Sequence, residues 1–560
     1  MRLRHARAVL LAFTLCGVCQ AARLPAQGPL VITNARVVTL DSAHPDAGAI
    51  AFAGGRIAAL GDSALARRAT SRVIDAHGAT VVPAFTDHHA HLLNIGLWLL
   101  NDARREQLFV DVSTVRSLDE LAQRLRDRAR LTPAGGWVLG AGWSQASWGT
   151  QALPAADVLT NAVPDHPVFL ARTDGHAGWA NAAALGLAGI RGSTGLLLEG
   201  ANDALTARIP SLPDRDIRRA FRLAAEALAA RGVVEVYDAG ALAFPGVVGL
   251  NADHARFVRL LRTEDAARPL PLRVNLMVPA PSALADSLLR HPGNRRLSPR
   301  IRITHLKLFA DGALGSRGAA LTHPYADDST TRGVARMTAA EIGALALRAV
   351  DAGLGVATHA IGDEAVKRAL DAYDAVIAAR PAVAHGRLRI EHFSYARDED
   401  FARAARLGVA LSIQSNFNSA VEDAPPFGAM RVGAAAEPRV YAWDRLHRLG
   451  ALLVEGSDYF ARPLEPLAGF AAALTRRNAI GPSRADADAR LRALAMQAAR
   501  LTPNGERLDP ALRVGAPADV VLLSDNPLTA PRESLAGVTV RMTLAGGRDT
   551  HAAPPRVRAP

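Results

Sequence analysis

The residues of this 560-residue sequence best suited to catalysis are histidines that directly follow short apolar segments. Residues 81–86 run into Asp-His-His-Ala-His at positions 87–91. In an extended strand, residues i and i+2 point to the same face, so His89 and His91 can reach one ion. Imidazole and carboxylate ligands suit Zn, Mn, Fe, Co or Ni, and a catalytic site keeps an open position for water. The spacing therefore predicts a divalent metal site that activates water.

Other polar residues end later apolar segments in the same way. They are Lys307 within residues 301–309, His359 after residues 354–358, His392 after residues 388–391 and Asp458 after residues 451–457. The carboxyl ends of the strands of a β/α barrel meet at one mouth, so we expect these side chains to converge there. Beside a metal, Asp458 is the predicted catalytic residue, because a carboxylate there can take the proton of the attacking water and pass it to the leaving group.

Lysine is rare in this chain, since only Lys307 and Lys367 are lysines among 65 basic residues. A lysine at a strand end therefore suits a task that arginine cannot perform. A neutral amine can take up CO2 to give a carbamate whose two oxygens bridge two metals, whereas guanidinium stays charged. The alternative is a structural salt bridge, and Lys367, next to Arg368, is expected on a solvated helix face.

The elements that must position these residues fall into two kinds. Residues 30–40, 49–60, 519–523 and 538–544 are rich in β-branched and other strand-forming residues and are predicted to be strands. Between these flanks, apolar strands alternate with helices such as 218–230, 339–352 and 363–379. This alternation favours an α/β fold, a (β/α)8 TIM barrel with a small β-sandwich domain built from both chain ends. The expected boundaries are 27–82 and 505–552 for the sandwich and 83–504 for the barrel, with an insertion near 100–230.

The N-terminus is typical of a secretory signal peptide, expected to span residues 1–26. Three arginines precede an apolar run, at residues 8–18, that is too short to span a bilayer, and small residues follow. We expect an exported, periplasmic protein with no membrane contact after cleavage. Cleavage would remove Cys16 and Cys19, leaving no disulfide and no thiol nucleophile.

Composition excludes several classes of protein. With 49% hydrophobic and 21% charged residues, the chain is neither disordered nor fibrous. The formal charge of +12 is spread along the sequence without a basic stripe interleaved with aromatic residues, so no nucleic-acid partner is expected. The expected partner is a small-molecule substrate, and the sequence does not determine the oligomeric state.

Several motifs in order resemble those of one known family. Residues 83–91 resemble the opening motif of the amidohydrolase superfamily. Residues 163–181, 306–317, 359–363, 389–392 and 456–458 resemble its amidohydrolase-3 (YtcJ-like) family of metal-dependent hydrolases, which includes N-substituted formamide deformylases. The resemblance extends from about residue 30 to residue 544, nearly the whole predicted mature chain.

The resemblance implies a (β/α)8 barrel and hydrolysis of carbon–nitrogen bonds by metal-activated water. It also implies one or two bound divalent ions, most simply Zn, and a set of side chains that bind them. In that set, His89 and His91 bind one ion, carbamylated Lys307 bridges, His359 and His392 bind the second, and Asp458 is both ligand and acid/base.

The residues leave three functions open. The first is an exported amidohydrolase acting on an amide, a cyclic amide or an N-acyl or formamide bond. The second is an esterase, lactonase or phosphotriesterase using the same site, because the same activated water permits those reactions. The third is a non-catalytic exported binding protein, which would have no need of Asp458.

Three further residues are predicted to contact substrate, each with a structural alternative. His176 can polarise a carbonyl or serve as an ordinary structural histidine. Arg317 can bind an anionic group or form a loop ion pair. Trp143 can line a pocket or pack in a core.

Overall fold

The computed structural model describes most of the chain between residues 29 and 552. The described ranges are 29–67, 72–100, 102–148, 155–242, 254–293, 295–383, 386–417, 427–458, 466–475, 487–502 and 504–552. The predicted signal peptide, residues 1–26, lies outside them. None of the described helices is both long and apolar enough to cross a bilayer.

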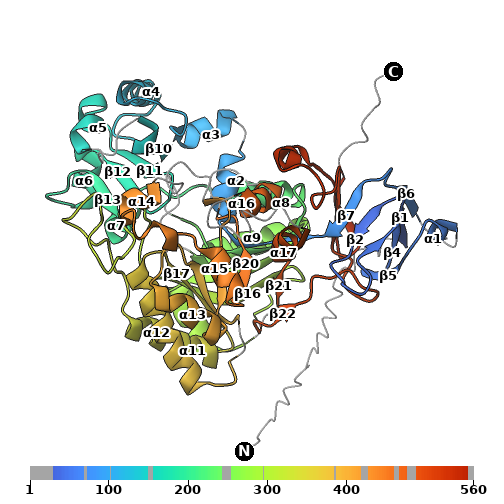
Figure 1. The fold of residues 1–560 in the computed structure, drawn as a ribbon. Helices are drawn as coiled ribbons and strands as arrows, with labels where there is room; N and C mark the ends of the chain where they lie inside the picture. Colours follow the sequence, from blue (N-terminus) through green and yellow to red (C-terminus); the bar gives the residue numbers. More distant parts are fainter. Residues whose placement is uncertain are drawn as a thin grey trace, which may run out of the picture.

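A barrel of eight parallel strands forms the centre of the molecule (Figure 1). Its strands, in spatial order, are β8 (Phe85–Ala90), β14 (Val233–Asp238), β15 (Arg273–Pro279), β16 (Ile301–Phe309), β17 (Gly355–Ala360), β18 (Leu388–His392), β19 (Ala410–Ile413) and β20 (Leu452–Glu455). The segment that follows β20 hydrogen-bonds to β8 and so joins the last strand to the first. The amide of Asp458 donates to the carbonyl of His89 at 2.6 Å, and the amide of Ser457 donates to the Asp87 carboxylate at 2.9 Å. The fold is a TIM barrel, as predicted.

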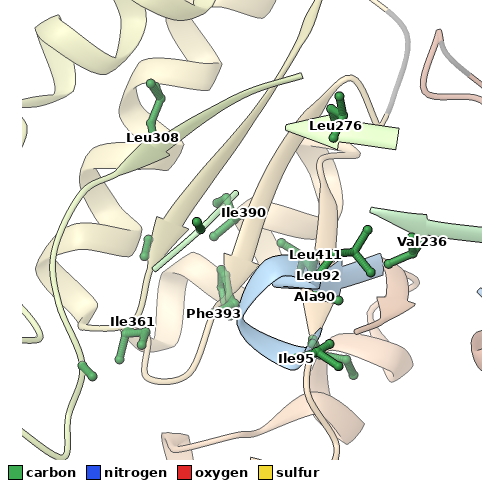
Figure 2. Packing of buried hydrophobic residues seen from close by; sticks show 14 of the residues in the cluster. Ala90, Leu92, Ile95, Val236, Leu276, Leu308, Ile361, Ile390, Phe393 and Leu411 are labelled. Atoms are coloured by element: carbon green, nitrogen blue, oxygen red, sulfur yellow. The ribbon is translucent and has the colours of Figure 1, made fainter. Parts of the chain in front are cut away.

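Helices cover the outside of the barrel. They include α2 (Leu92–Trp98), α8 (Asp214–Ala229), α9 (His254–Ala267), α11 (Ala339–Asp351), α12 (Asp363–Ala379), α13 (Asp398–Leu407), α15 (Trp443–Arg448), α16 (Pro466–Thr475) and α17 (Ala487–Gln497). Helix α11 begins with a capping box between Thr338 and Glu341, which satisfies amides that the first turn leaves free. Figure 2 shows strand residues such as Val236 and Ile390 in the buried cluster that also contains Leu92 of α2.

Two further sheets, built from both chain ends, form the sandwich that lies beside the barrel (Figure 1). One contains β5 (Arg56–Gly61), β4 (Ala49–Ala53), β1 (Leu30–Thr33) and β6 (Arg72–Asp75). The other contains β25 (Arg548–Ala552), β24 (Val540–Ala545), β23 (Val520–Leu523), β7 (Thr80–Pro83), β2 (Arg36–Val38) and β3 (Asp46–Ala47). Buried side chains such as Ile32, Phe52 and Leu522 form their common core.

Two segments predicted as single strands are each divided between sheets. Residues 30–40 form β1 and β2, which belong to different sheets, and Asn34 between them has a φ of 48°. Asparagine tolerates this left-handed conformation better than the neighbouring β-branched residues, so the chain turns there. Residues 81–86 are divided likewise, because β7 lies in the sandwich and β8 in the barrel.

Between β8 and β14 the chain forms a separate five-stranded sheet. Its strands are β13 (Leu196–Leu198), β12 (Ala177–Ala180), β11 (Val168–Arg172), β10 (Val138–Trp143) and β9 (Val110–Asp111). Helices α4 (Leu118–Arg130), α5 (Ala156–Ala162) and α6 (Ala182–Ala188) accompany the sheet, and the insertion has its own apolar core (Figure 1). The turn between β11 and β12 contains His176, a residue predicted to contact substrate.

Candidate metal centre

Three predicted ligands from three different barrel strands or strand ends meet at the mouth. His89, His392 and Asp458 each present a ligand atom, and these atoms all lie within 4.8 Å of one another. Asp458 Oδ1 lies 3.5 Å from His89 Nε2 and 3.1 Å from His91 Nε2. The geometry therefore gathers carboxylate and imidazole groups around one point.

The other predicted ligands adjoin this group. Lys307 Nζ lies 3.3 Å from His89 Nε2, and the His359 ring centroid lies 4.5 Å from that of His392. Both residues are about 1% exposed. The structure thus places all six predicted ligands together, although the positions they span run from residue 89 to residue 458.

Hydrogen-bond acceptors determine which nitrogen of two histidines faces the centre. His89 Nδ1 lies 2.6 Å from Glu391 Oε2, and His91 Nδ1 lies 2.6 Å from the Gly240 carbonyl. Because a carboxylate and a carbonyl only accept, each Nδ1 carries the hydrogen and each Nε2 keeps its lone pair. His359 has the opposite arrangement, with Nε2 lying 3.3 Å from the Gly312 carbonyl.

Two buried acidic residues, Glu391 and Asp311, stabilise the positions of the ligands. Glu391 accepts hydrogen bonds from Arg389 at 2.9 and 3.2 Å. Burial favours the neutral form, but Arg389, His89 and Lys307 together outweigh it and hold the pKa of Glu391 well below its ordinary value. Asp311 accepts three backbone amides, from Ala320, Ile361 and Gly362, at 2.8–3.0 Å. It thereby links the segments that follow β16 and β17.

Burial sets the protonation of the ligands. It lowers the pKa of His89 to about 4 and that of His392 to about 3, so both rings are neutral near pH 7. Burial also lowers the pKa of Lys307 to about 8, although Glu391 and Asp458 act in the opposite direction. A lysine with this pKa has an appreciable neutral fraction near pH 7, as carbamate formation requires.

The backbone is strained at two of the ligands. His392 has a φ of 78° and Asp458 a φ of 45°, and both values lie in the left-handed region that residues other than glycine rarely adopt. Such conformations cost about 1–3 kcal/mol each and persist where the surrounding structure determines them. Both residues stand at strand ends, and both of their side chains contribute to the group at the mouth.

The residues present fit a divalent metal ion. Asp458 Oδ1 is buried and has no well-directed hydrogen bond among the described residues, despite its short distance to His91. An unsatisfied carboxylate oxygen beside neutral imidazoles is a donor set that Zn²⁺ and similar ions prefer. His89, His91, His359, His392, Asp458 and Lys307, the last as a carbamate, would hold the metal.

His176 approaches this centre from the insertion. Its ring centroid lies 4.7 Å from that of His359, and its Nδ1 lies 3.0 Å from Glu199 Oε1. Glu199 is also paired with Arg336. Burial would lower the pKa of His176, but Glu199 raises it above its ordinary value. The structure thus places His176 at the edge of the group of ligands.

The structure places Arg317 and Trp143 in structural roles instead of at the centre. Arg317 pairs with Asp327 at 3.1 Å, and Asp327 also pairs with Arg431. Trp143 is completely buried in the core of the insertion, where its Nε1 donates to the Leu170 carbonyl at 2.9 Å. These contacts match the structural alternatives for the two residues, a loop ion pair for Arg317 and a core position for Trp143.

The residues that orient the ligands are not among the site residues predicted from the sequence. They are Glu391, Asp311, Gln414 and the carbonyl of Gly240. An acid within an apolar strand, directly before His392, was an available signal for Glu391. Gly240 follows β14 and Gln414 follows β19. Neither strand is predicted from the sequence.

Comparisons with known proteins agree with this geometry. A model of the amidohydrolase family matches residues 72–551. The N-substituted formamide deformylase of Arthrobacter pascens is 30% identical over 410 residues, covering 68% of this chain and 72% of the relative. YtcJ of Bacillus subtilis is 28% identical over 503 residues, covering 85% and 89%. The crystal structure of an uncharacterized metal-dependent hydrolase from Pyrococcus horikoshii has a TM-score of 0.68 at 27% identity, covering 90% of this chain and 99% of that one.

Proposed function

The chain belongs to the amidohydrolase family, and from this premise we propose that it hydrolyses a carbon–nitrogen bond in a small amide, cyclic amide or N-acyl compound, N-formyl compounds included. The observation that carries the proposal is the group of His89, His392 and Asp458 at the barrel mouth, with a buried carboxylate oxygen lacking a well-directed hydrogen bond. A purely binding protein would gain nothing from that oxygen, whereas hydrolysis needs both a metal ligand and a proton carrier.

The centre would use one or two divalent ions, with Zn as the simplest choice. A divalent ion lowers the pKa of a water molecule towards ~7 and polarises a carbonyl oxygen. The six ligand side chains would hold it, with Lys307 acting after carbamylation. Its burial and its lowered pKa support that modification, because CO2 reacts with the neutral amine.

Asp458 is the proposed acid/base. Its contacts with His89, His91 and His392 outweigh its burial and hold its pKa below the ordinary value, so Asp458 is ionised near pH 7. It can therefore accept a proton from the attacking water and then donate that proton to the departing nitrogen. We assign His176 to the substrate side, where it would orient the carbonyl or the leaving group.

The preference for carbon–nitrogen bonds rests on similarity to the formamide deformylase. A panel of N-formyl amines, cyclic amides, carboxylic esters, lactones and phosphotriesters tests it with metal-replete protein. The proposal expects the fastest turnover on a nitrogen leaving group, and loss of that turnover with a chelator. Faster turnover of an ester, a lactone or a phosphotriester would support the alternative hydrolase. No turnover across the panel would favour the binding protein.

We also propose that the protein is exported to the periplasm with cleavage after Ala22 or Ala26, because residues 1–26 have the charge and apolar pattern of a signal. N-terminal sequencing of protein from a periplasmic fraction tests this. A mature chain that still begins at Met1 would contradict it.

A further inference from the structure

Gln414 directly follows β19 and contacts the imidazole of His392. Its Oε1 lies 2.8 Å from His392 Nδ1, and its Nε2 donates to the Ser412 carbonyl at 3.1 Å. The Ser412 carbonyl can only accept, so it fixes the amide with Oε1 toward the histidine. Because Oε1 also only accepts, Nδ1 of His392 must carry the hydrogen, and the lone pair lies on Nε2.

We propose that Gln414 is a positioning residue that fixes the tautomer and orientation of His392 for metal binding. This inference rests on the proposed function, since it assumes that His392 is a metal ligand. Partners on the second nitrogen of a ligating histidine typically change metal affinity 10–100-fold.

A competing acceptor makes this role necessary. Asp458 Oδ2 lies 3.7 Å from the same Nδ1 of His392. Without Gln414, the Nδ1 hydrogen would turn to Asp458 and occupy a carboxylate oxygen needed for the ion and for proton transfer. The shorter contact at 2.8 Å keeps the hydrogen on the Gln414 side. Gln414 therefore orients His392 and also keeps the Asp458 carboxylate available to the metal ion.

Neighbouring residues hold Gln414 in place. The amide and hydroxyl of Ser415 donate to Glu455, at the end of β20, at 2.9 and 2.8 Å. Asn416 Nδ2 donates to the Ser457 carbonyl at 3.2 Å. The segment after β19 is thereby bound to the segment that leads to Asp458. Gln414 and Ser415 are both buried, so water does not compete for these hydrogen bonds.

Phe417 restricts the remaining movement of the ring. It stacks on His392 with centroids 5.9 Å apart and an interplanar angle of 9°. Phe417 in turn contacts Tyr441 edge to face at 6.5 Å. One aromatic face and one hydrogen-bonded edge together define the orientation of the imidazole.

Zn²⁺ affinity tests the role of Gln414 independently of activity. Metal-free full-length protein competes with a chromogenic chelator for Zn²⁺, and the melting temperature of the metal-free form is recorded in parallel. We expect Gln414→Leu to weaken Zn²⁺ binding roughly 10–100-fold with little change in that melting temperature. Gln414→Glu keeps an acceptor facing His392 Nδ1 but loses the hydrogen bond to the Ser412 carbonyl, so it should lose clearly less Zn²⁺ affinity than Gln414→Leu. Equal losses in the Leu and Glu variants, or no loss in either, would overturn the proposal.

Gln497→Leu is a matched control. Gln497 is also a buried glutamine, but its amide nitrogen has no hydrogen-bond partner among the described residues, and none of its described contacts is with His392. Its substitution should leave Zn²⁺ affinity unchanged. If Gln414→Leu does not fold, Gln414→Asn takes its place, because the shorter amide cannot reach Nδ1 and the same loss is expected. An Asn variant with wild-type affinity would contradict the inference.

The outcomes separate this inference from the proposed function. Wild-type protein that takes up no Zn²⁺ would contradict both. Wild-type protein that binds Zn²⁺ tightly, together with a Gln414→Leu variant that binds equally well, would contradict only the role of Gln414.

Discussion

The barrel interior contains two groups of histidines that resemble each other in burial and differ in partners. His89 and His392 lie at the mouth, whereas His88 and His305 lie nearer the base. All four are buried, and burial lowers the pKa of each to about 3 or 4. Burial and basicity therefore do not separate a metal ligand from a core histidine.

Their partners do separate the two groups. His88 stacks on Tyr237 with ring centroids 4.7 Å apart, and its Nε2 lies 2.9 Å from the Ala499 carbonyl. Neither ring nitrogen of His305 has a well-directed hydrogen bond among the described residues, and the polar group beside its ring is the backbone of Gly386. At the mouth, an acceptor fixes Nδ1 of each ring and a carboxylate lies nearby. A fixed tautomer beside a shared carboxylate, rather than burial, characterises the candidate ligands.

The largest effect should come from Asp458, the carboxylate that the histidines at the mouth share. Asp458→Asn keeps the shape of the side chain but removes the proton carrier, so turnover should fall roughly 10²–10⁴-fold. Steady-state kinetics on a substrate found in the panel, with metal content measured by elemental analysis, checks this. Full activity in the Asn variant would refute the acid/base role.

Substituting two neighbouring histidines compares mouth and base directly. His89→Gln should weaken Zn²⁺ affinity by at least ~10²-fold, because it removes a ligand rather than the partner of a ligand. His88→Gln, one residue earlier in β8, should keep Zn²⁺ affinity and lose only stability. Chelator competition and thermal unfolding of both variants provide the test. Loss of Zn²⁺ in the His88 variant alone would reverse the assignment.

A smaller effect is expected at the partner of His89. Glu391→Gln replaces a carboxylate acceptor by an amide, and Zn²⁺ affinity should fall roughly 10–100-fold. The same competition measurement checks it. An unchanged affinity would show that the 2.6 Å contact between Glu391 and His89 contributes only to folding.

Protonation of Glu235, at the base of the barrel, should lower the stability of the fold in acid. Glu235 pairs with Arg273 and Arg500, which outweigh its burial and lower its pKa from 4.5 to about 2. A depressed carboxylate pKa stabilises the fold above pH 4.5, and this stabilisation is lost as pH falls from 4.5 toward 2. The loss approaches ~1.4 kcal/mol per pH unit. Denaturant unfolding between pH 5 and 3 measures it, and a Glu235→Gln variant with the same acid sensitivity as wild type would contradict the assignment.

Part of this architecture could be predicted from the sequence. β16 and β18 have the predicted bounds, because each is a largely apolar run with an unusual polar residue at or near its end, Lys307 in β16 and His392 in β18. β14, β15 and β19 were not identified: β15 and β19 end in Pro279 and Ile413, which have no chemical role, and Asp238 at the end of β14 is not part of a recognised motif. The division of residues 30–40 between two sheets was also missed, because the turn at Asn34 interrupts an otherwise continuous strand pattern.

The ligands could be predicted in the same way, but their partners could not. His89, His359 and His392 stand where a barrel strand must end, so topology alone brings them together. Gln414 and Gly240 each accept a hydrogen bond from one ligand histidine through a single oxygen. That contact depends on a distance in the folded structure, which the spacing of residues along the sequence does not reveal. His176 arrives from a separate sheet, and only the three-dimensional fold determines its approach to His359.

Anomalous diffraction at the zinc edge, from crystals of Zn²⁺-loaded protein, tests the central claim most directly. The account predicts a peak at the barrel mouth about 2.0–2.2 Å from His89 Nε2 and from an oxygen of Asp458. A mouth without a peak, or a peak beside His88 or His305, would contradict it.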